Sequence, residues 1–375
     1  MNDWPDGRWP RFPRPREDEL FSSWLARLAI ANGAKASLIA TQTDLALGSN
    51  YLRSIDYIAN ESLLDCIAHR VGLSSAALWK TTLSDYLVHL SVIDTKRNQN
   101  LLLLGLIGFK KERFFLQYCP LCLRDSPHFR RLWRISSIVT CPVHGMVLHD
   151  RCSSCGAPIN VFGNDEKDKR LPYQGEICIC WNCGFDLKES PAVETSENMV
   201  KFSARIADAT ESGHLLLASS EWCYLGAFLL GIRQLTHALL KAQSTRYPGV
   251  MYDIDMLPLD IRFRLIEEVV DALSNLPDSF LRICQRWGIT PYRLKTLERT
   301  SGPLPYWLSS KVSLCLVPRV VATNQAEVAH AIQVMRSRKL KVNPYSVSRF
   351  MGLYKSDVVD KYFAENLVNK VNVEQ

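Results

Sequence analysis

Apolar residues recur with helical spacing through most of this chain. Near the N-terminus, Leu20, Trp24 and Leu28 follow one another every four residues, the pattern of a helix with one buried face, so Trp24 is expected in the core. Runs that alternate apolar and polar residues, as strands do, are scarce, and one of them is Trp133–Thr140. The predicted fold is therefore mainly α, with small β or loop modules in the middle of the chain.

Three segments share one spacing that is typical of two helices joined by a tight turn. In each, an apolar and a small residue are followed by a glycine four positions after the small one, and by apolar residues one and six positions after the glycine. The segments are Ile67-Ala68, Gly72-Leu73 and Leu78; Ile283-Cys284, Gly288-Ile289 and Leu294; and Val347-Ser348, Gly352-Leu353 and Val358. A helix-turn-helix unit needs this pattern, because the small residue lets the helices cross closely and the glycine takes up a left-handed turn. An ordinary pair of packed helices would use the same residues.

Charge distinguishes the three segments. The helix predicted after Gly288 carries Arg293, Lys295 and Arg299, which suit phosphates or guanine edges. The first segment offers only Lys80, and the third offsets its lysines with acidic residues. A second basic run without any acid comprises Arg336, Arg338, Lys339 and Lys341. These two groups are the predicted nucleic-acid contacts.

Eight residues with metal-ligand spacing form four pairs between positions 119 and 183. In each pair two residues separate the ligands, as in a tight turn that directs both at one ion. The pairs are Cys119 and Cys122, Cys141 and His144, Cys152 and Cys155, and Cys180 and Cys183. Because structural zinc takes four such ligands tetrahedrally, the pattern predicts two bound zinc ions.

Spacing alone leaves open which pairs share an ion. Sequential pairing is favoured because both loops then have ordinary zinc-ribbon lengths, and a cross-braced arrangement is the alternative. Cys178 could replace Cys180, but only Cys180 has the two-residue spacing to Cys183. Disulfides are the alternative to metal, and the lack of a signal-peptide pattern speaks for a reducing compartment instead. With four protein ligands each, the ions are expected to fold the segment and to catalyse nothing.

The chain length of 375 residues leaves room for two or three domains. The predicted division is an N-terminal helical domain over residues 1–112, a double zinc module over 113–190 and a C-terminal helical domain over 191–375. Helix-turn-helix-like units are expected in both helical domains. No run is long and apolar enough to cross a membrane, and the net charge of +7 is mild.

No motif for catalysis is present in the sequence. It holds no Walker-type phosphate cradle and no nucleophile elbow, and its carboxylates form no evident acidic triad for phosphoryl transfer. We therefore expect a binding protein with no catalytic residues.

Two stretches of the chain resemble the TniQ family. The first is PRPREDELFSSWLARLA, residues 13–29, with Asn32-Gly33 after it. The second is similar to the zinc region of that family and comprises YCPLCLRD at 118–125, LWR at 132–134, CPVHG at 141–145 and RCSSCG at 151–156. The second half of the chain resembles the family only through its helix-turn-helix character.

The resemblance implies a protein that selects target sites for DNA transposition without cutting or joining DNA. TniQ and its longer relative TnsD are target-selection subunits of bacterial transposons, so a cytoplasmic, DNA-associated bacterial protein is implied. Shorter members dock on a CRISPR effector of the Cascade type with its guide RNA, recruit the AAA+ regulator TnsC and can form homodimers. The chain length favours this adaptor role. The alternative is a TnsD-like protein that reads target DNA directly, or a zinc-containing transcription regulator.

The stretch with the family's opening pattern also holds the expected protein contacts. Glu19 and Arg27 are eight residues apart, about two helical turns, and so fall near one face of the predicted helix. This charged flank, or the proline-rich arm Trp9–Pro15 before it, is the predicted contact for TnsC.

Overall fold

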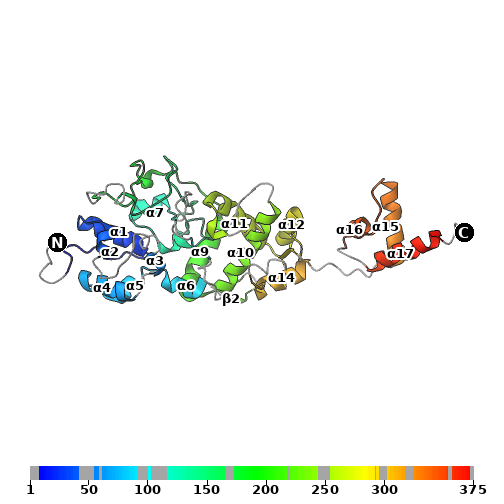
Figure 1. The fold of residues 1–375 in the computed structure, drawn as a ribbon, viewed down its shortest axis with the longest axis horizontal. Helices are drawn as coiled ribbons and strands as arrows, with labels where there is room; N and C mark the ends of the chain where they lie inside the picture. Colours follow the sequence, from blue (N-terminus) through cyan, green and yellow to red (C-terminus); the bar gives the residue numbers. More distant parts are fainter. Residues whose placement is uncertain are drawn as a thin grey trace. The chain divides into compact units, whose positions relative to one another are not determined.

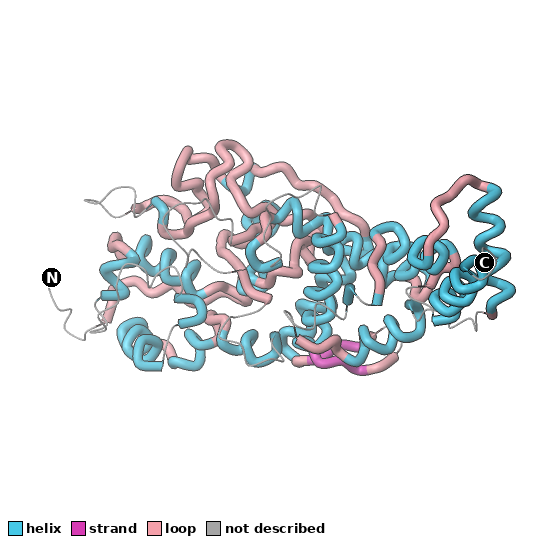
Figure 2. Tube along the Cα trace, turned by 45° about the vertical axis from the view of Figure 1, so that its right-hand side comes forward, coloured by secondary structure: helices cyan, strands magenta, loops and turns pink. Residues whose placement is uncertain are grey.

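A computed structural model of the chain shows a mainly helical protein, as predicted (Figures 1 and 2). It describes residues 8–41, 55–58, 61–90, 100–102, 116–164, 173–217, 220–243, 254–291, 293–294, 302–316, 324–353 and 357–371. The chain divides into two compact units, Met1–Ser309 and Ser310–Gln375, which we call unit 1 and unit 2. The domain limits expected at residues 112 and 190 fall inside unit 1 and stay predictions.

Unit 1 begins with short helices, continues through a segment with little regular structure, and ends in longer helices. The first group is α1 (Phe21–Ala31), α2 (Ala36–Thr41), α3 (Ile55–Ile58), α4 (Glu61–Val71), α5 (Ser75–Trp79) and α6 (Ser84–Leu90). The middle segment holds α7 (Pro120–Asp125) and the 3-10 turns η1 (Arg131–Arg134) and η2 (Leu187–Glu189). The last group is α9 (Glu197–Ser212), β1 (His214–Leu216), β2 (Trp222–Tyr224), α10 (Leu225–Ala242), η3 (Ile254–Met256), α11 (Leu259–Ser274), α12 (Asp278–Trp287) and α14 (Tyr306–Leu316).

After the end of α14, the described residues of unit 2 form three helices with their own apolar core. Its helices are α15 (Gln325–Ser337), α16 (Pro344–Phe350) and α17 (Asp357–Val371). Val328, Ile332 and Met335 of α15 lie at helical spacing and pack with Val347 of α16 and Val359 of α17. Burial of this one stripe brings the three helices together.

Helix α1 confirms the apolar pattern near the N-terminus. Phe21, Trp24, Leu25 and Leu28 are all fully buried. The indole Nε1 of Trp24 donates to the carbonyl of Pro13 at 2.8 Å, so the one polar atom of this side chain is satisfied. Trp24 is therefore a core residue, as expected.

A buried ion pair joins α3 to the middle segment. The guanidinium of Arg134 lies 2.6 Å from the carboxylate of Asp56, and both side chains are fully buried. Arg134 also donates to the carbonyl of Leu102, and Asp56 accepts from the backbone and hydroxyl of Ser22 in α1. Because each charge keeps several partners, burial of the pair is tolerated.

A second buried arginine joins the middle segment to the later helices. Arg262 of α11 is fully buried, and its guanidinium donates to Gln117 at 2.9 Å and to the carbonyl of Ser136 at 2.7 Å. Nearby, the amide of Leu259 at the start of α11 donates to the carboxylate of Asp150. These contacts tie α11 to the middle segment, although the two are far apart in sequence.

The three glycine-centred segments share the same turn. Gly72, Gly288 and Gly352 all have left-handed backbones, with φ of 65°, 60° and 74°. After each glycine, the next amide donates five residues back: Leu73 to Ala68, Ile289 to Cys284 and Leu353 to Ser348, at 3.0, 2.8 and 2.7 Å. This is the Schellman closure of a helix, and it explains why the pattern needs a glycine there. The helix-turn-helix role in DNA binding stays a prediction.

The strand content differs from the expectation at one segment. Trp133–Thr140 is not a strand, because its first two residues belong to the 3-10 turn η1 and the rest forms only isolated bridges. Among the described residues, the one regular sheet is the antiparallel pair β1–β2, in which Leu215 lies opposite Cys223. No helix in the described part of the chain is long and apolar enough to span a membrane.

Candidate metal centres

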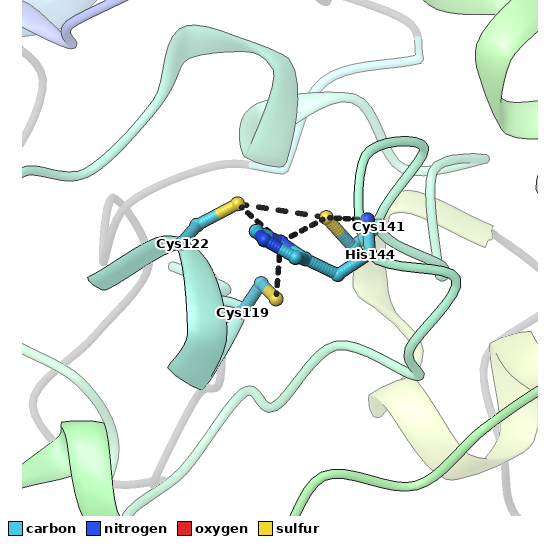
Figure 3. Close-up of side chains that lie close together, drawn as sticks. All are labelled: Cys119, Cys122, Cys141 and His144. Atoms are coloured by element: carbon cyan, nitrogen blue, oxygen red, sulfur yellow. Dashed lines mark hydrogen bonds between the residues drawn. The ribbon is translucent and has the colours of Figure 1, made fainter. Parts of the chain in front are cut away.

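The first four-ligand cluster combines two loops of the middle segment (Figure 3). The sulfur atoms of Cys122 and Cys141 are 3.6 Å apart, and Nδ1 of His144 lies 3.2 Å from Cys122 and 3.7 Å from Cys119. A tetrahedron of ligands about 2.3 Å from a central zinc has edges of about 3.8 Å between sulfurs. The side chains are therefore already spaced to hold one tetrahedral ion.

The second cluster has the same spacing with four thiols. Cys152 and Cys183 are 3.7 Å apart, as are Cys155 and Cys180. Cys155 and Cys183 are exposed, whereas the first cluster is almost entirely buried. The two sets confirm sequential pairing over the cross-braced alternative, because each ion would take two consecutive pairs.

Three of the four ligand pairs are shaped by one recurring turn. Gly145, Gly156 and Gly184 directly follow the second ligand of their pairs and have left-handed backbones with φ of 65°, 72° and 78°. Their amides donate to the carbonyls of the first ligands, Cys141, Cys152 and Cys180, at 3.0, 2.9 and 2.9 Å. The glycine closes each loop tightly enough to direct both ligands to one point.

The remaining pair lies at the start of a helix. Cys119 is the N-cap of α7 and Pro120 is its first residue. Proline is favoured there because its fixed φ suits the first turn and its missing N–H is not needed. The helix then places Cys122 one turn after Cys119, toward the same ion.

Cys178 takes no part in either cluster. Its side chain is buried, and burial raises the pKa of its thiol to about 12. Cys180, and not Cys178, lies with Cys152, Cys155 and Cys183 in the second set of four. The preference for Cys180 over Cys178 is confirmed.

Two residues outside the predicted ligand set support the clusters. Nε2 of His144 lies 3.0 Å from the carboxylate of Asp125, which orients the ring so that Nδ1 faces the sulfurs. The side-chain amide of Asn182 donates to Cys155 at 3.5 Å, and this contact is the main cause that lowers the pKa of Cys155 to about 6. Sequence reasoning missed both, although Asp125 lies three residues after Cys122 and so on the same side of α7.

The donor sets fit structural zinc and leave no position for a substrate. Each cluster supplies four protein ligands, whereas a catalytic zinc keeps one position open. Each of the seven cysteines in the two clusters is a free thiol. The clusters can bind metal ions, and zinc is the ion preferred by a tetrahedron of four thiolates or of three thiolates and one imidazole.

The charged flank expected on α1 is not a surface. The carboxylate of Glu19 is fully buried and lies 2.6 Å from the guanidinium of Arg27, whose side chain is 17% exposed. Glu19 also accepts from the hydroxyl of Ser23. The prediction of a partner contact at Glu19 is wrong, because this residue and Arg27 form an internal ion pair that helps to hold the start of α1.

The proline-rich arm before α1 packs along the helix. Trp9 is buried, and the backbone amide of Arg11 donates to the side chain of Asn32 at 3.1 Å. Phe12 remains 46% exposed, and Arg14 is exposed as well. The arm is thus a strap that covers the core on one side and presents Arg11, Phe12 and Arg14 on the other.

The predicted nucleic-acid residues fall in both units. Arg293 is exposed in unit 1, near the start of the helical stretch after Gly288, whereas Lys295 and Arg299 lie outside the described residues. The other group belongs to unit 2, where all its members are exposed: Arg336, Arg338, Lys339 and Lys341.

A family model described as TniQ matches residues 10–148. This span holds the arm except for Trp9, together with α1 and the first ligand cluster, and it ends before Cys152. No curated protein matches the chain.

Proposed function

We propose, from the match of residues 10–148 to the TniQ family model, that the chain is a target-selection adaptor for DNA transposition. In this role it links a targeting complex, a CRISPR effector of the Cascade type with its guide RNA, to the AAA+ regulator TnsC and the transposase. The family match is the observation that carries the proposal, since membership implies a part in transposition target selection. The chain itself cuts and joins no DNA.

The ligand clusters support a binding role. They are closed by protein side chains, so a bound metal would hold the loops and would offer no site to a substrate. Metal-dependent cleavage of plasmid DNA by the pure protein, lost on substitution of one carboxylate, would contradict this part of the proposal.

The outward residues of the arm are the proposed contact for TnsC. Arg11, Phe12 and Arg14 are exposed and lie next to one another on a strap whose inner side is fixed. An exposed aromatic residue between two arginines is the composition that protein interfaces favour. Removal of the whole arm would uncover the α1 core around Trp24, so point substitutions are needed to test the contact.

The test is a pulldown with the full-length chain, co-expressed with TnsC and with the effector complex and its guide RNA. The adaptor role requires that the wild-type chain bring TnsC and the effector into one assembly. Phe12→Ala combined with Arg14→Glu should reduce recovery of TnsC at least tenfold and leave recovery of the effector unchanged, because only the outer side of the arm is altered. Lys201→Glu on α9, an exposed cation outside the arm, is the matched control and should change neither.

Two results would contradict this proposal in different ways. Normal TnsC recovery with the double variant removes the arm from the contact but keeps the adaptor role. Failure of the wild-type chain to bind either partner, together with preference for one duplex sequence by about 10³-fold or more, would establish direct DNA reading instead.

A further inference from the structure

The turn between α15 and α16 in unit 2 carries an unusual concentration of positive charge. Arg336, Arg338, Lys339 and Lys341 lie within six residues, all are exposed, and no acidic residue is among them. Among the described residues, none of the four forms an ion pair. We call residues 336–341 the basic turn.

The basic turn has a fixed backbone. The amide of Leu340 donates to the carbonyl of Met335 at 2.9 Å, which closes the end of α15. The hydroxyl of Ser346 donates to the carbonyl of Lys341 at 2.7 Å, and Ser346 also forms a capping box with Asn343 at the start of α16. Both ends of the turn are therefore held by helices, so little backbone entropy is lost when its cations bind a ligand.

Lys339 occupies a backbone position that glycine normally fills. Its φ is 55°, in the left-handed region, at the C-terminal end of α15. Other helices of this chain end with glycine in that conformation, at Gly33, Gly72, Gly213, Gly288 and Gly352. A side chain is disfavoured there. The presence of lysine is explained if its ammonium group has a use that outweighs the backbone strain.

The helix after the glycine turn of unit 2 has the opposite charge. Asp357, Asp360 and Glu365 are exposed on α17. In the usual helix-turn-helix geometry this helix would enter the major groove. The phosphates that line the groove would repel its carboxylates.

The acidic helix and the basic turn meet opposite ends of α15. Gln325, in the first turn of α15, donates to Glu365 of α17 at 2.6 Å. Arg336 follows eleven residues later, about 16 Å along the helix at 1.5 Å per residue. Figure 1 shows the same arrangement within unit 2, with α17 at one end of α15 and the turn to α16 at the other. A polyanion can thus approach the turn without meeting Glu365.

We propose that the basic turn binds the phosphodiester backbone of a nucleic acid and that α17 does not read bases. Four exposed cations on a turn held at both ends can contact a row of phosphates. Contacts to phosphates do not distinguish one base sequence from another. The adaptor role is a separate claim, because it depends on protein partners and the present one on phosphate alone. Either can fail without the other.

The test measures binding of the full-length chain to fluorescent 30-mers over a series of salt concentrations. One probe is duplex DNA of arbitrary sequence and the other is single-stranded RNA of the same sequence. Each phosphate contact contributes about 0.9 to the slope of log affinity against log salt for duplex DNA, and about 0.7 for a single strand. Arg338→Gln with Lys341→Gln should therefore lower the duplex slope by about 1.8 and the affinity about 60-fold at 0.1 M salt.

Lys339→Gly separates the proposed contact from a merely structural role. It relieves the left-handed backbone, so the Tm of unit 2 should stay unchanged or rise, while the duplex slope falls by about 0.9. The matched control is Asp357→Asn with Asp360→Asn, which should leave binding unchanged or strengthen it. Slope losses on both probes, of about 0.9 per lost contact for the duplex and about 0.7 for the single strand, identify the shared phosphodiester backbone as the ligand. A slope loss on one probe alone shows which of the two nucleic acids is bound.

The proposal is overturned if the glutamine and glycine variants bind both probes with wild-type affinity and slope. It is also overturned if Lys361→Gln, on α17, weakens binding more than Arg338→Gln with Lys341→Gln does. In that case the helix after the glycine turn is the contact, despite its acidic residues.

Discussion

The ligand-bearing segment of unit 1 and the three-helix unit 2 reach a defined structure by different means. The described residues between 119 and 183 have little regular secondary structure (Figure 2). Their loops meet at two sets of four ligands. Unit 2 has no such cluster among its described residues, and its helices share one apolar stripe. In the first region the fold depends on a few metal ligands. In the second it depends on many apolar contacts, each of which contributes little free energy.

The largest loss of stability is expected when a single metal-ligating cysteine is replaced. Cys122→Ser should unfold the ligand-bearing segment, because a structural zinc site contributes on the order of 10 kcal/mol of folding free energy. Metal analysis should find about two zinc ions per wild-type chain and a reduced number in the variant. Hydrogen exchange should show that the amides of α15 stay protected, since unit 2 has its own core.

Cys178→Ser is the matched control for this substitution. It also replaces a buried thiol in the same segment, but Cys178 lies outside both clusters. It should keep both metal ions and lose only about 1–3 kcal/mol. Metal loss equal to that of Cys122→Ser would mean that the second cluster is wrongly assigned.

Sequence reasoning predicted the parts of the molecule that depend on short-range rules. The two-residue spacing of the ligand pairs follows from coordination chemistry, and the left-handed glycines follow from backbone sterics, so both were predictable from local sequence. The contacts of Arg134 with Asp56 and of Arg262 with Gln117 were not, because they join residues 78 and 145 positions apart. The same reason explains the error at Glu19: a charged residue beside an apolar stripe suggests solvent, and only the packed structure shows its buried partner.

The second prediction concerns the ion pair that fastens the ligand-bearing segment to α3. Asp56→Asn should destabilise unit 1 by about 3–5 kcal/mol, because it leaves the fully buried Arg134 without a counter-charge. Chemical denaturation monitored by tryptophan fluorescence would measure this loss. Asp65→Asn, at an exposed position on α4, is the control and should have little effect. A loss below about 1 kcal/mol for Asp56→Asn would show that Arg134 finds other acceptors.

A third prediction uses pH to probe the same unit. His128 is buried, its Nε2 lies 3.1 Å from the carbonyl of Glu17, and burial lowers the pKa of its ring to about 4. The unfolded chain takes up this proton near pH 6.5, so the stability due to neutral His128 is present above about pH 6.5 and is lost as the pH falls towards 4. Denaturation should show a loss of about 1.4 kcal/mol per pH unit in this range. His128→Gln should remove that part of the slope, and an unchanged slope would mean that other groups cause it.

The smallest effect is expected at the cap of α16 in unit 2. The side chain of Asn343 accepts from the amide of Ser346 at 2.7 Å, while the Ser346 hydroxyl accepts from the amide of Asn343 at 2.9 Å. Asn343→Ala should destabilise unit 2 by about 1 kcal/mol, and Asn343→Gly by only a few tenths, because glycine leaves the helix N-terminus open to water. Hydrogen exchange of amides in α15 measures the loss, since exchange there requires unit 2 to open. The loss is small in absolute terms, yet it should be visible across the whole unit because three short helices share one core. Loss of protection in α16 alone would show instead that the helices of unit 2 open one at a time. The ligand-bearing segment and unit 2 would then differ in the cooperativity of unfolding as well as in the size of the stability loss.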